Sequence, residues 1–228
     1  MRVTVIYETM NKGSTYACVK LILNQLKTTI DINVDEFFLS KCISESDFNN
    51  NIINFTTEQE KFNYLDFTKT ISKSLEKSDL IIVAYPPNYF KKRCRIDTFL
   101  TELSYNYDLS ISKDSMINKI GLIISNPNNH CLFTINKNAK NNLRFLGLKK
   151  IFEFSNKVTP MGWENMNLRR KEKICNKIYE ASSKLMSFNN RLYDINRFHN
   201  ISYMICSDSI KRKNINKITE LRDWRIKN

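Results

Sequence analysis

Residues 2–16 read RVTVIYETMNKGSTY, and this stretch decides the fold. Its first part, 2–7, is a short β-branched apolar run, which is typical of a strand buried in a parallel sheet. The residues after it are rich in hydroxyl groups and lead into 14–28, where apolar residues fill a broad helix face. A strand, a turn and a helix N-terminus form a site for an anion, because free N–H groups and the helix dipole both favour negative charge. The stretch therefore predicts a strand–turn–helix unit with a phosphate site at its turn.

Four side chains of this turn suit a phosphate. Thr9, Ser14 and Thr15 bring hydroxyl donors, and Lys12 brings a nearby positive charge. The alternative is that Ser14 only caps the helix, as serine commonly does at this position. The turn lacks a full glycine-rich signature, so this segment alone leaves both interpretations open.

Strand and helix patterns alternate along the rest of the chain. Several strands, such as LIIVA at 80–84, are continuous apolar runs, as expected when helices cover both faces of a sheet. The alternation predicts an α/β fold with a doubly wound, five-stranded parallel sheet in the order 2-1-3-4-5. Gly147 is placed to end a helix in a left-handed conformation, and 40–57 has no clear period and is predicted to be a loop. The predicted strands are 2–7, 32–38, 79–85, 118–125 and 150–155, and the predicted helices are 14–28, 58–77, 94–106, 135–146 and 165–187.

Composition narrows the class of protein. With 228 residues, 42% apolar and 26% charged, the chain is composed like an ordinary globular protein. No apolar run could span a membrane, and the chain enters a strand at once without room for a signal peptide, so we expect a cytoplasmic protein. Six scattered cysteines and two histidines give no zinc-binding pattern, and we predict no metal site.

The net charge of +13 raises the question of nucleic-acid binding. The basic residues are spread along the chain and no binding module is recognisable, so we predict no nucleic-acid partner; a small anionic ligand suits such a surface equally well. Residues 188–228 differ from the rest, with nine Lys or Arg against four acids and a short apolar stretch at 201–205. We therefore predict one domain over 1–187 and a basic, helical C-terminal tail over 188–228. The tail could pack on the body, pair with a second subunit or lie on an anionic surface; its apolar stretch is short for membrane binding, which favours the first two.

Three loops are expected to meet at one crevice, because in this strand order the loops after strands 1, 3 and 4 converge. The second loop, YPPNYF at 85–90, has a rigid turn and two aromatic residues, and the third, SNPNNH at 125–130, is rich in amides. A phosphate cradle, an aromatic wall and an amide-rich edge suit a planar phosphorylated ring system such as FMN. Each loop also has a purely structural explanation, as a strand terminator, part of the core or a turn. The candidate residues of these two loops are Pro86, Pro87, Asn88, Tyr89, Phe90, Ser125, Asn126, Asn128 and His130.

Three segments carry a resemblance to a known family. They are VIYETMNKGSTY at 5–16, SDLIIVAYPPNYF at 78–90 continuing to FLTELSY, and NKIGLIISNPNNH at 118–130 continuing through NAKNNLRFLGLKKIFEF. Through them the chain resembles the flavodoxin-fold, FMN-dependent NAD(P)H oxidoreductases over most of residues 1–187. The resemblance implies a flavodoxin-like fold, FMN as cofactor, and NADH or NADPH as co-substrate. It also implies a small electron acceptor such as a quinone, and a homodimer, which is common among relatives.

The resemblance assigns roles to residues of the first two loops. In the family the loop after strand 1 binds the FMN phosphate, a role that falls here on Thr9, Asn11, Ser14 and Thr15. The family's Pro-Val-Tyr turn lies along the flavin ring and corresponds to 86–88, with Tyr89 next. No side chain is required as an acid or base, because the cofactor carries the chemistry, and we predict no catalytic residue.

The chain departs from the family pattern at several positions. Glu8 stands where the family usually has glycine, and Asp97 stands where it has lysine. The third loop contains no glycine. These departures favour the alternative function, a flavodoxin-fold binding or regulatory protein whose cofactor site has degenerated.

Overall fold

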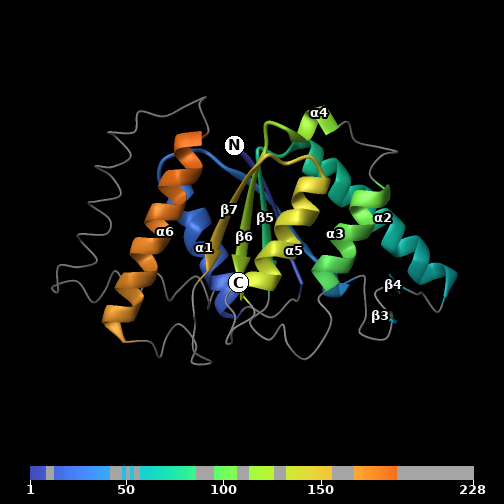
Figure 1. The fold of residues 1–228 in the computed structure, drawn as a ribbon, viewed down its shortest axis with the longest axis horizontal. Coiled ribbons are helices and arrows are strands. Elements are labelled where there is room, and N and C mark those ends of the chain that lie inside the picture. Colours follow the sequence, from blue (N-terminus) through green and yellow to red (C-terminus); the bar gives the residue numbers. More distant parts are fainter. Residues whose placement is uncertain are drawn as a thin grey trace. The chain divides into compact units, whose positions relative to one another are not determined.

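The structure is a computed structural model that describes residues 1–8, 13–41, 48–49, 52–53, 57–85, 95–106, 113–125, 132–155 and 167–188. Strands and helices alternate, as Figure 1 shows. The strands are β1 (Arg2–Tyr7), β2 (Asn33–Phe38), β3 (Phe48–Asn49), β4 (Ile52–Ile53), β5 (Leu80–Tyr85), β6 (Ile120–Ser125) and β7 (Lys150–Ser155). The helices are α1 (Ser14–Lys27), the 3₁₀ helix η1 (Leu39–Lys41), α2 (Glu58–Lys77), α3 (Arg95–Asn106), α4 (Lys113–Met116), α5 (Leu132–Phe145) and α6 (Leu168–Phe188).

Five strands form one parallel sheet in the order β2-β1-β5-β6-β7. Counted without the short β3–β4 pair, this is the predicted order 2-1-3-4-5, and that prediction is confirmed. All five predicted strands end at the residue where the observed strands end. At the carboxyl edge of the sheet, Tyr85 lies opposite Ser125, and Ser125 lies opposite Ser155.

One face of the sheet is covered by α2, α3 and α5 (Figure 1). Val83 and Ile123 of the sheet join Leu75, Phe99 and Leu143 of these helices in a single buried cluster. Every residue of β5 and β6 is buried, so both faces of the central strands are covered, as their continuous apolar runs predicted.

Two glycines fix the packing of α5 on the sheet. Gly147 has a φ of 101°, and its N–H donates to the carbonyl of Arg144 while the N–H of Leu148 donates to that of Leu143. This is the Schellman arrangement, and the predicted left-handed cap is confirmed. At Gly121 of β6, an added Cβ would lie 3.0 Å from Leu148 Cδ2 and 3.3 Å from Leu143 Cδ1, so a larger residue would push the end of α5 away.

The prediction of a plain loop over 40–57 was incomplete. Residues 39–41 form η1, and β3 and β4 pair antiparallel. Two-residue strands are too short to show an alternating pattern, which explains why the sequence did not reveal them. The start of α2 did have a signal: Thr57 and Glu60 form a capping box, the reciprocal pair that the pattern Thr-x-x-Glu predicts.

The chain divides into two compact units, Met1–Val19 with Asp31–Val158, and Lys20–Ile30 with Thr159–Asn228. The first contains the whole sheet and the helices α2, α3 and α5. In the second, Thr29 Oγ1 lies 3.7 Å from Met186 Sδ of α6, a donor–acceptor contact to a soft sulfur atom. The predicted division into 1–187 and 188–228 stays a prediction, because the tail after Phe188 lies outside the described residues.

Candidate functional site

Three of the predicted site residues, Ser14, Thr15 and Ser125, lie within the described part of the chain, at the carboxyl edge of the sheet. The others lie outside the described residues. They are Thr9, Asn11, Lys12, Pro86, Pro87, Asn88, Tyr89, Phe90, Asn126, Asn128 and His130. The described part of the site consists of the strand ends and helix starts that border the three loops.

The N-terminus of α1 follows the first loop. The carbonyl of Gly13 accepts a hydrogen bond from the N–H of Ala17 at 3.0 Å, which makes Gly13 the N-cap and Ser14 the first helical residue. Ser14 is thus one position past the N-cap that the sequence alternative required. An added Cβ on Gly13 would meet nothing within 4 Å, so the cap is open on that side. The first N–H groups of an α-helix have no partner within the helix, so the start of α1 offers donors to an anion.

Thr15 joins the first loop to the second. Its Oγ1 donates to the backbone carbonyl of Tyr85 at 2.9 Å, and both residues are buried. A threonine hydroxyl has one proton, and in this geometry Thr15 donates it to the backbone at the end of β5. The start of α1 and the start of the second loop are therefore held together by a direct bond.

Tyr85 is held at its side chain as well. Its hydroxyl donates to Asp97 Oδ1 at 2.7 Å, and Asp97 lies in the first turn of α3. An acidic residue is favourable at that end of a helix because the helix dipole is positive there. The position at which the chain departs from the family's lysine thus has a structural role in this molecule.

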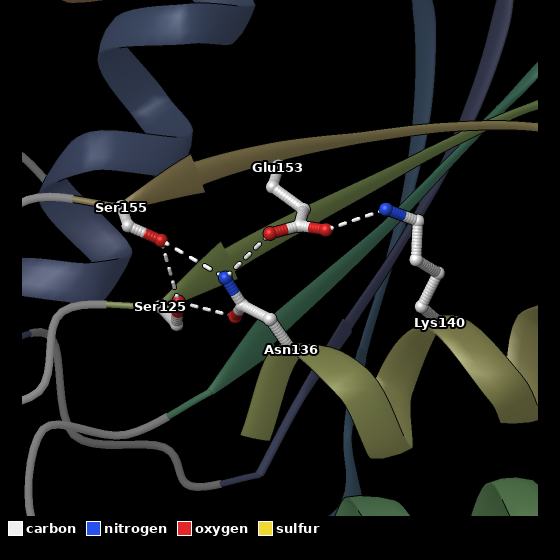
Figure 2. A network of polar contacts seen from close by, with 5 residues as sticks. All are labelled: Ser125, Asn136, Lys140, Glu153 and Ser155. Carbon is white, nitrogen blue, oxygen red and sulfur yellow. Dashed lines mark hydrogen bonds and ion pairs between the residues drawn. The ribbon is translucent and has the colours of Figure 1, made fainter. Parts of the chain in front are cut away.

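A network of side chains closes the carboxyl ends of β6 and β7 (Figure 2). Ser125 Oγ donates to Asn136 Oδ1 at 2.9 Å and lies 3.0 Å from Ser155 Oγ. Asn136 Nδ2 donates to Glu153 Oε2 at 2.8 Å and to Ser155 Oγ at 3.3 Å. Lys140 completes the network from the surface, with its Nζ 2.8 Å from Glu153 Oε1.

The proton count of this network fixes its direction. Ser125 donates to Asn136, Asn136 donates to Ser155, and Ser155 must then donate back to Ser125 to complete the ring. Ser125 is only 1% exposed, and its single hydroxyl proton is committed within the ring. Ser125, a predicted cofactor residue, is thus the last residue of β6, and its side chain joins that strand end to Asn136 of α5.

The end of β1 carries an aromatic cluster. Tyr7 stacks on Phe38 with ring centroids 4.8 Å apart and lies 5.3 Å from the ring of Tyr16 in α1. Its hydroxyl donates to Glu36 Oε1 at 2.8 Å, and burial together with this carboxylate raises the pKa of Tyr7 far above its usual value. Tyr7 is therefore neutral at any ordinary pH, and its role here is packing.

Ser40 adds a polar atom beside the first loop. Its N–H donates to the carbonyl of Glu8 at 3.1 Å. Its Oγ is buried and has no hydrogen-bond partner among the residues that the structure describes. A buried hydroxyl without a partner is costly, so this atom favours a further polar group at the edge where β1 and β2 end.

Sequence reasoning missed the ring around Asn136 and the contact between Tyr85 and Asp97. The sequence held a signal for the first of these. Glu153 and Ser155 alternate with apolar residues in β7, which places them on the same face of an otherwise apolar strand. Asp97 was noticed only as a departure, and its hydroxyl partner could not be inferred from its position in the sequence.

The described residues contain neither a membrane-spanning helix nor a metal-binding cluster. No helix in those ranges is long and apolar enough to cross a membrane. Within the same ranges, no group of three or more His, Cys, Asp or Glu side chains could hold a metal ion.

Comparisons with known proteins agree with the topology. No protein-family model and no curated protein matches the chain. An FMN-dependent NADH-azoreductase from Bacillus anthracis, solved with FMN, is similar with a TM-score of 0.55 and 11% identity over 82% of this chain and 99% of that one. RosB with bound 8-demethyl-8-formylriboflavin-5'-phosphate is similar with a TM-score of 0.51 and 12% identity over 95% of this chain and 92% of that one. The Trp repressor binding protein from Bacillus subtilis has a TM-score of 0.51 and 11% identity over 85% of this chain and 99% of that one. At such low identity these similarities show the fold, and the fold of this chain is flavodoxin-like.

Proposed function

We propose that the protein is an FMN-dependent oxidoreductase that takes a hydride from NADH or NADPH and passes electrons to a small acceptor such as a quinone. The observation that carries this proposal is the bond from Thr15 to the Tyr85 carbonyl. It brings the start of α1 and the start of the aromatic second loop together at the carboxyl edge of a 2-1-3-4-5 sheet, which is where this fold binds its ligands. Solved structures of the same fold include proteins that hold FMN or a related flavin phosphate.

The described residues fit the phosphate of FMN. The N-terminus of α1 offers N–H groups and a positive dipole, and Ser14 adds a hydroxyl. The unpartnered Ser40 Oγ lies at the same edge. Thr9, Asn11 and Lys12 are proposed to complete the phosphate site, and residues 86–90 with Asn126, Asn128 and His130 to border the ring.

The chemistry that FMN supplies when bound is acceptance of a hydride from a nicotinamide and delivery of the electrons to an acceptor. The residues of this chain bind and orient: the α1 N-terminus fixes the phosphate, and the ring around Asn136 holds the first residue of the third loop. We propose further that the protein acts in the cytoplasm as a homodimer.

The decisive experiment is FMN titration of the purified protein, followed by its visible absorption and by quenching of FMN fluorescence. The S14E variant places a carboxylate at the start of α1 and is expected to weaken FMN binding by about 100-fold or more, because like charges repel at close range. Its stability should not fall, since an acid in the first helical turn is favourable. The control N141E adds the same charge at an exposed position of α5 and should leave the affinity within about twofold. A wild-type protein that binds no added FMN would disprove the proposal.

The alternative is a flavodoxin-fold binding protein without a cofactor, and Glu8 beside the phosphate site favours it. This alternative predicts a colourless protein that S14E leaves unchanged in every flavin measurement. The E8G variant separates the two functions, because removing the carboxylate should tighten FMN binding only if the phosphate lies near it.

A further inference from the structure

Tyr85 is held at its backbone and at its side chain by residues of two different helices. Its carbonyl accepts from Thr15 of α1, and its hydroxyl donates to Asp97 of α3. Tyr85 itself is fully buried, at 0% exposure, and belongs to the main core cluster. A residue held this way has no freedom to shift without breaking a buried hydrogen bond.

The place of Tyr85 in the chain gives these contacts their meaning. Tyr85 ends β5 and Arg95 begins α3, so the longer loop 86–94, which includes all of the second loop after Tyr85, lies between them. The bond from Tyr85 to Asp97 therefore joins the two ends of that loop. The bond from Thr15 joins the same point to the helix that follows the first loop.

We infer that Thr15, Tyr85 and Asp97 are positioning residues that fix the phosphate-binding loop and the ring-binding loop relative to each other. The inference rests on the proposed function, because it is that function which assigns the two loops to one ligand. It gives Thr15 a different role from the phosphate contact that the sequence predicted: its proton goes to Tyr85, and its effect on FMN is exerted through the backbone. It also explains the carboxylate at position 97, since a lysine there could not accept the Tyr85 hydroxyl proton.

The chain offers a matched control. Tyr64 of α2 donates its hydroxyl to Glu102 Oε2 of α3 at 2.6 Å, and Tyr64 belongs to the same buried cluster as Tyr85. Neither Tyr64 nor Glu102 borders a predicted cofactor loop. The Y64F and Y85F variants thus remove the same kind of bond from the same core, and only the second should affect the site.

The first measurement is FMN affinity by fluorescence titration. T15V, Y85F and D97A should each weaken binding by about tenfold, and Y64F should leave it within about twofold. The Y85F/D97A double variant should weaken FMN binding by less than the product of the two single effects, because both changes remove the bond between Tyr85 and Asp97. T15S and D97N, which keep the donor and the acceptor respectively, should recover most of the wild-type affinity.

The second measurement needs no FMN. Trypsin can cut after Lys91, Lys92 and Arg93, all within the loop 86–94 that joins β5 to α3. In the native protein without flavin, T15V, Y85F and D97A should raise the cleavage rate at these sites about fivefold, the factor expected when one hydrogen bond no longer opposes local opening. Y64F should not raise it. A residue that acted only as a phosphate ligand would not change cleavage in the absence of FMN, so T15V distinguishes the two roles of Thr15.

The two measurements separate failure of the inference from failure of the proposed function. If the wild type binds FMN and the T15V and D97A variants bind it equally well, the inference is wrong and the proposed function stands. If the wild type does not bind FMN, the proposed function is wrong, and the cleavage rates alone decide the inference. Rates that are unchanged in Y85F and D97A, or raised equally in Y64F, would overturn it.

Discussion

Two tyrosine–carboxylate pairs meet on α3, and they have the same chemistry in different places. Tyr85 donates to Asp97 at 2.7 Å, and Tyr64 donates to Glu102 at 2.6 Å. The second pair joins two helices, α2 and α3, across the core, whereas the first joins a strand to the helix that follows it across a loop. Both bonds stabilise the fold, but only the first constrains a segment that the sequence assigns to ligand binding. Two hydrogen bonds of similar chemistry can therefore differ in their importance for function. The difference comes from where each bond lies in the fold, and the strength of the bond does not reveal it.

The largest expected effect comes from disturbing the packing of α3, the helix that carries the carboxylates of both pairs. Phe99 lies in α3 between Asp97 and Glu102, is 0% exposed, and meets the Tyr64 ring edge-on with centroids 6.5 Å apart. The F99A variant should lose about 3–5 kcal/mol of unfolding free energy, because it removes a buried ring and leaves a cavity. Urea unfolding measures the loss. The control F145A, at a position that is 71% exposed, should change stability by less than about 0.5 kcal/mol. A similar loss in both variants would show that α3 is not the common support.

The next largest expected effect is the loss of folding stability at high pH that the Tyr64–Glu102 pair produces. Burial raises the pKa of Tyr64 well above its usual value, and the hydrogen bond to Glu102 and the charge of that carboxylate add to the shift. Above pH 10 the unfolded chain loses this proton while the folded chain keeps it, so stability is present below pH 10 and is lost as pH rises further. The loss should be about 1.4 kcal/mol per pH unit for Tyr64, and Tyr7, raised by the same causes, should add a similar slope.

The Y64F variant removes the contribution of Tyr64 to the pH dependence of the unfolding free energy. Its unfolding free energy should fall less steeply than that of the wild type between about pH 10 and 11. Urea unfolding of both proteins at several pH values in this range measures the difference. Parallel curves would show that the Tyr64 hydroxyl is not buried against Glu102 in the folded state.

The sequence predicted the sheet well because its signals are local and redundant. Continuous apolar runs at 80–84 and 120–124 mark central strands, and the alternation of strands and helices restricts the topology to very few orders. Gly147 was identified as a cap because few other residues adopt a positive φ at low cost. Such features depend on neighbours along the chain, which a sequence displays directly.

The site was predicted less completely, because its contacts link residues far apart in sequence. Thr15 and Tyr85 were both placed in candidate loops, but their bond depends on how a helix start meets a strand end across the sheet. The ring of Ser125, Asn136 and Ser155 depends likewise on three elements meeting at one edge. Asparagine and serine are common on helix surfaces and strand ends, so their types alone do not mark them as partners.

The smallest expected effect concerns a third carboxylate, which lies at the surface. Glu153 accepts from the buried Asn136 and also from Lys140, and both ends of the ion pair are 35% exposed. The K140A variant should lose no more than about 0.2–1 kcal/mol, and high salt should reduce the difference from the wild type, because water and ions screen this pair. The N136A variant should lose about 1–3 kcal/mol that salt does not reduce, since it leaves the buried Ser125 hydroxyl and the half-buried Ser155 hydroxyl without their shared partner. Urea unfolding at low and high salt measures both variants. Equal losses would mean that the ion pair supports the ring from outside. A larger, salt-independent loss in N136A would show that the buried amide contributes more than the surface ion pair to holding the end of β6.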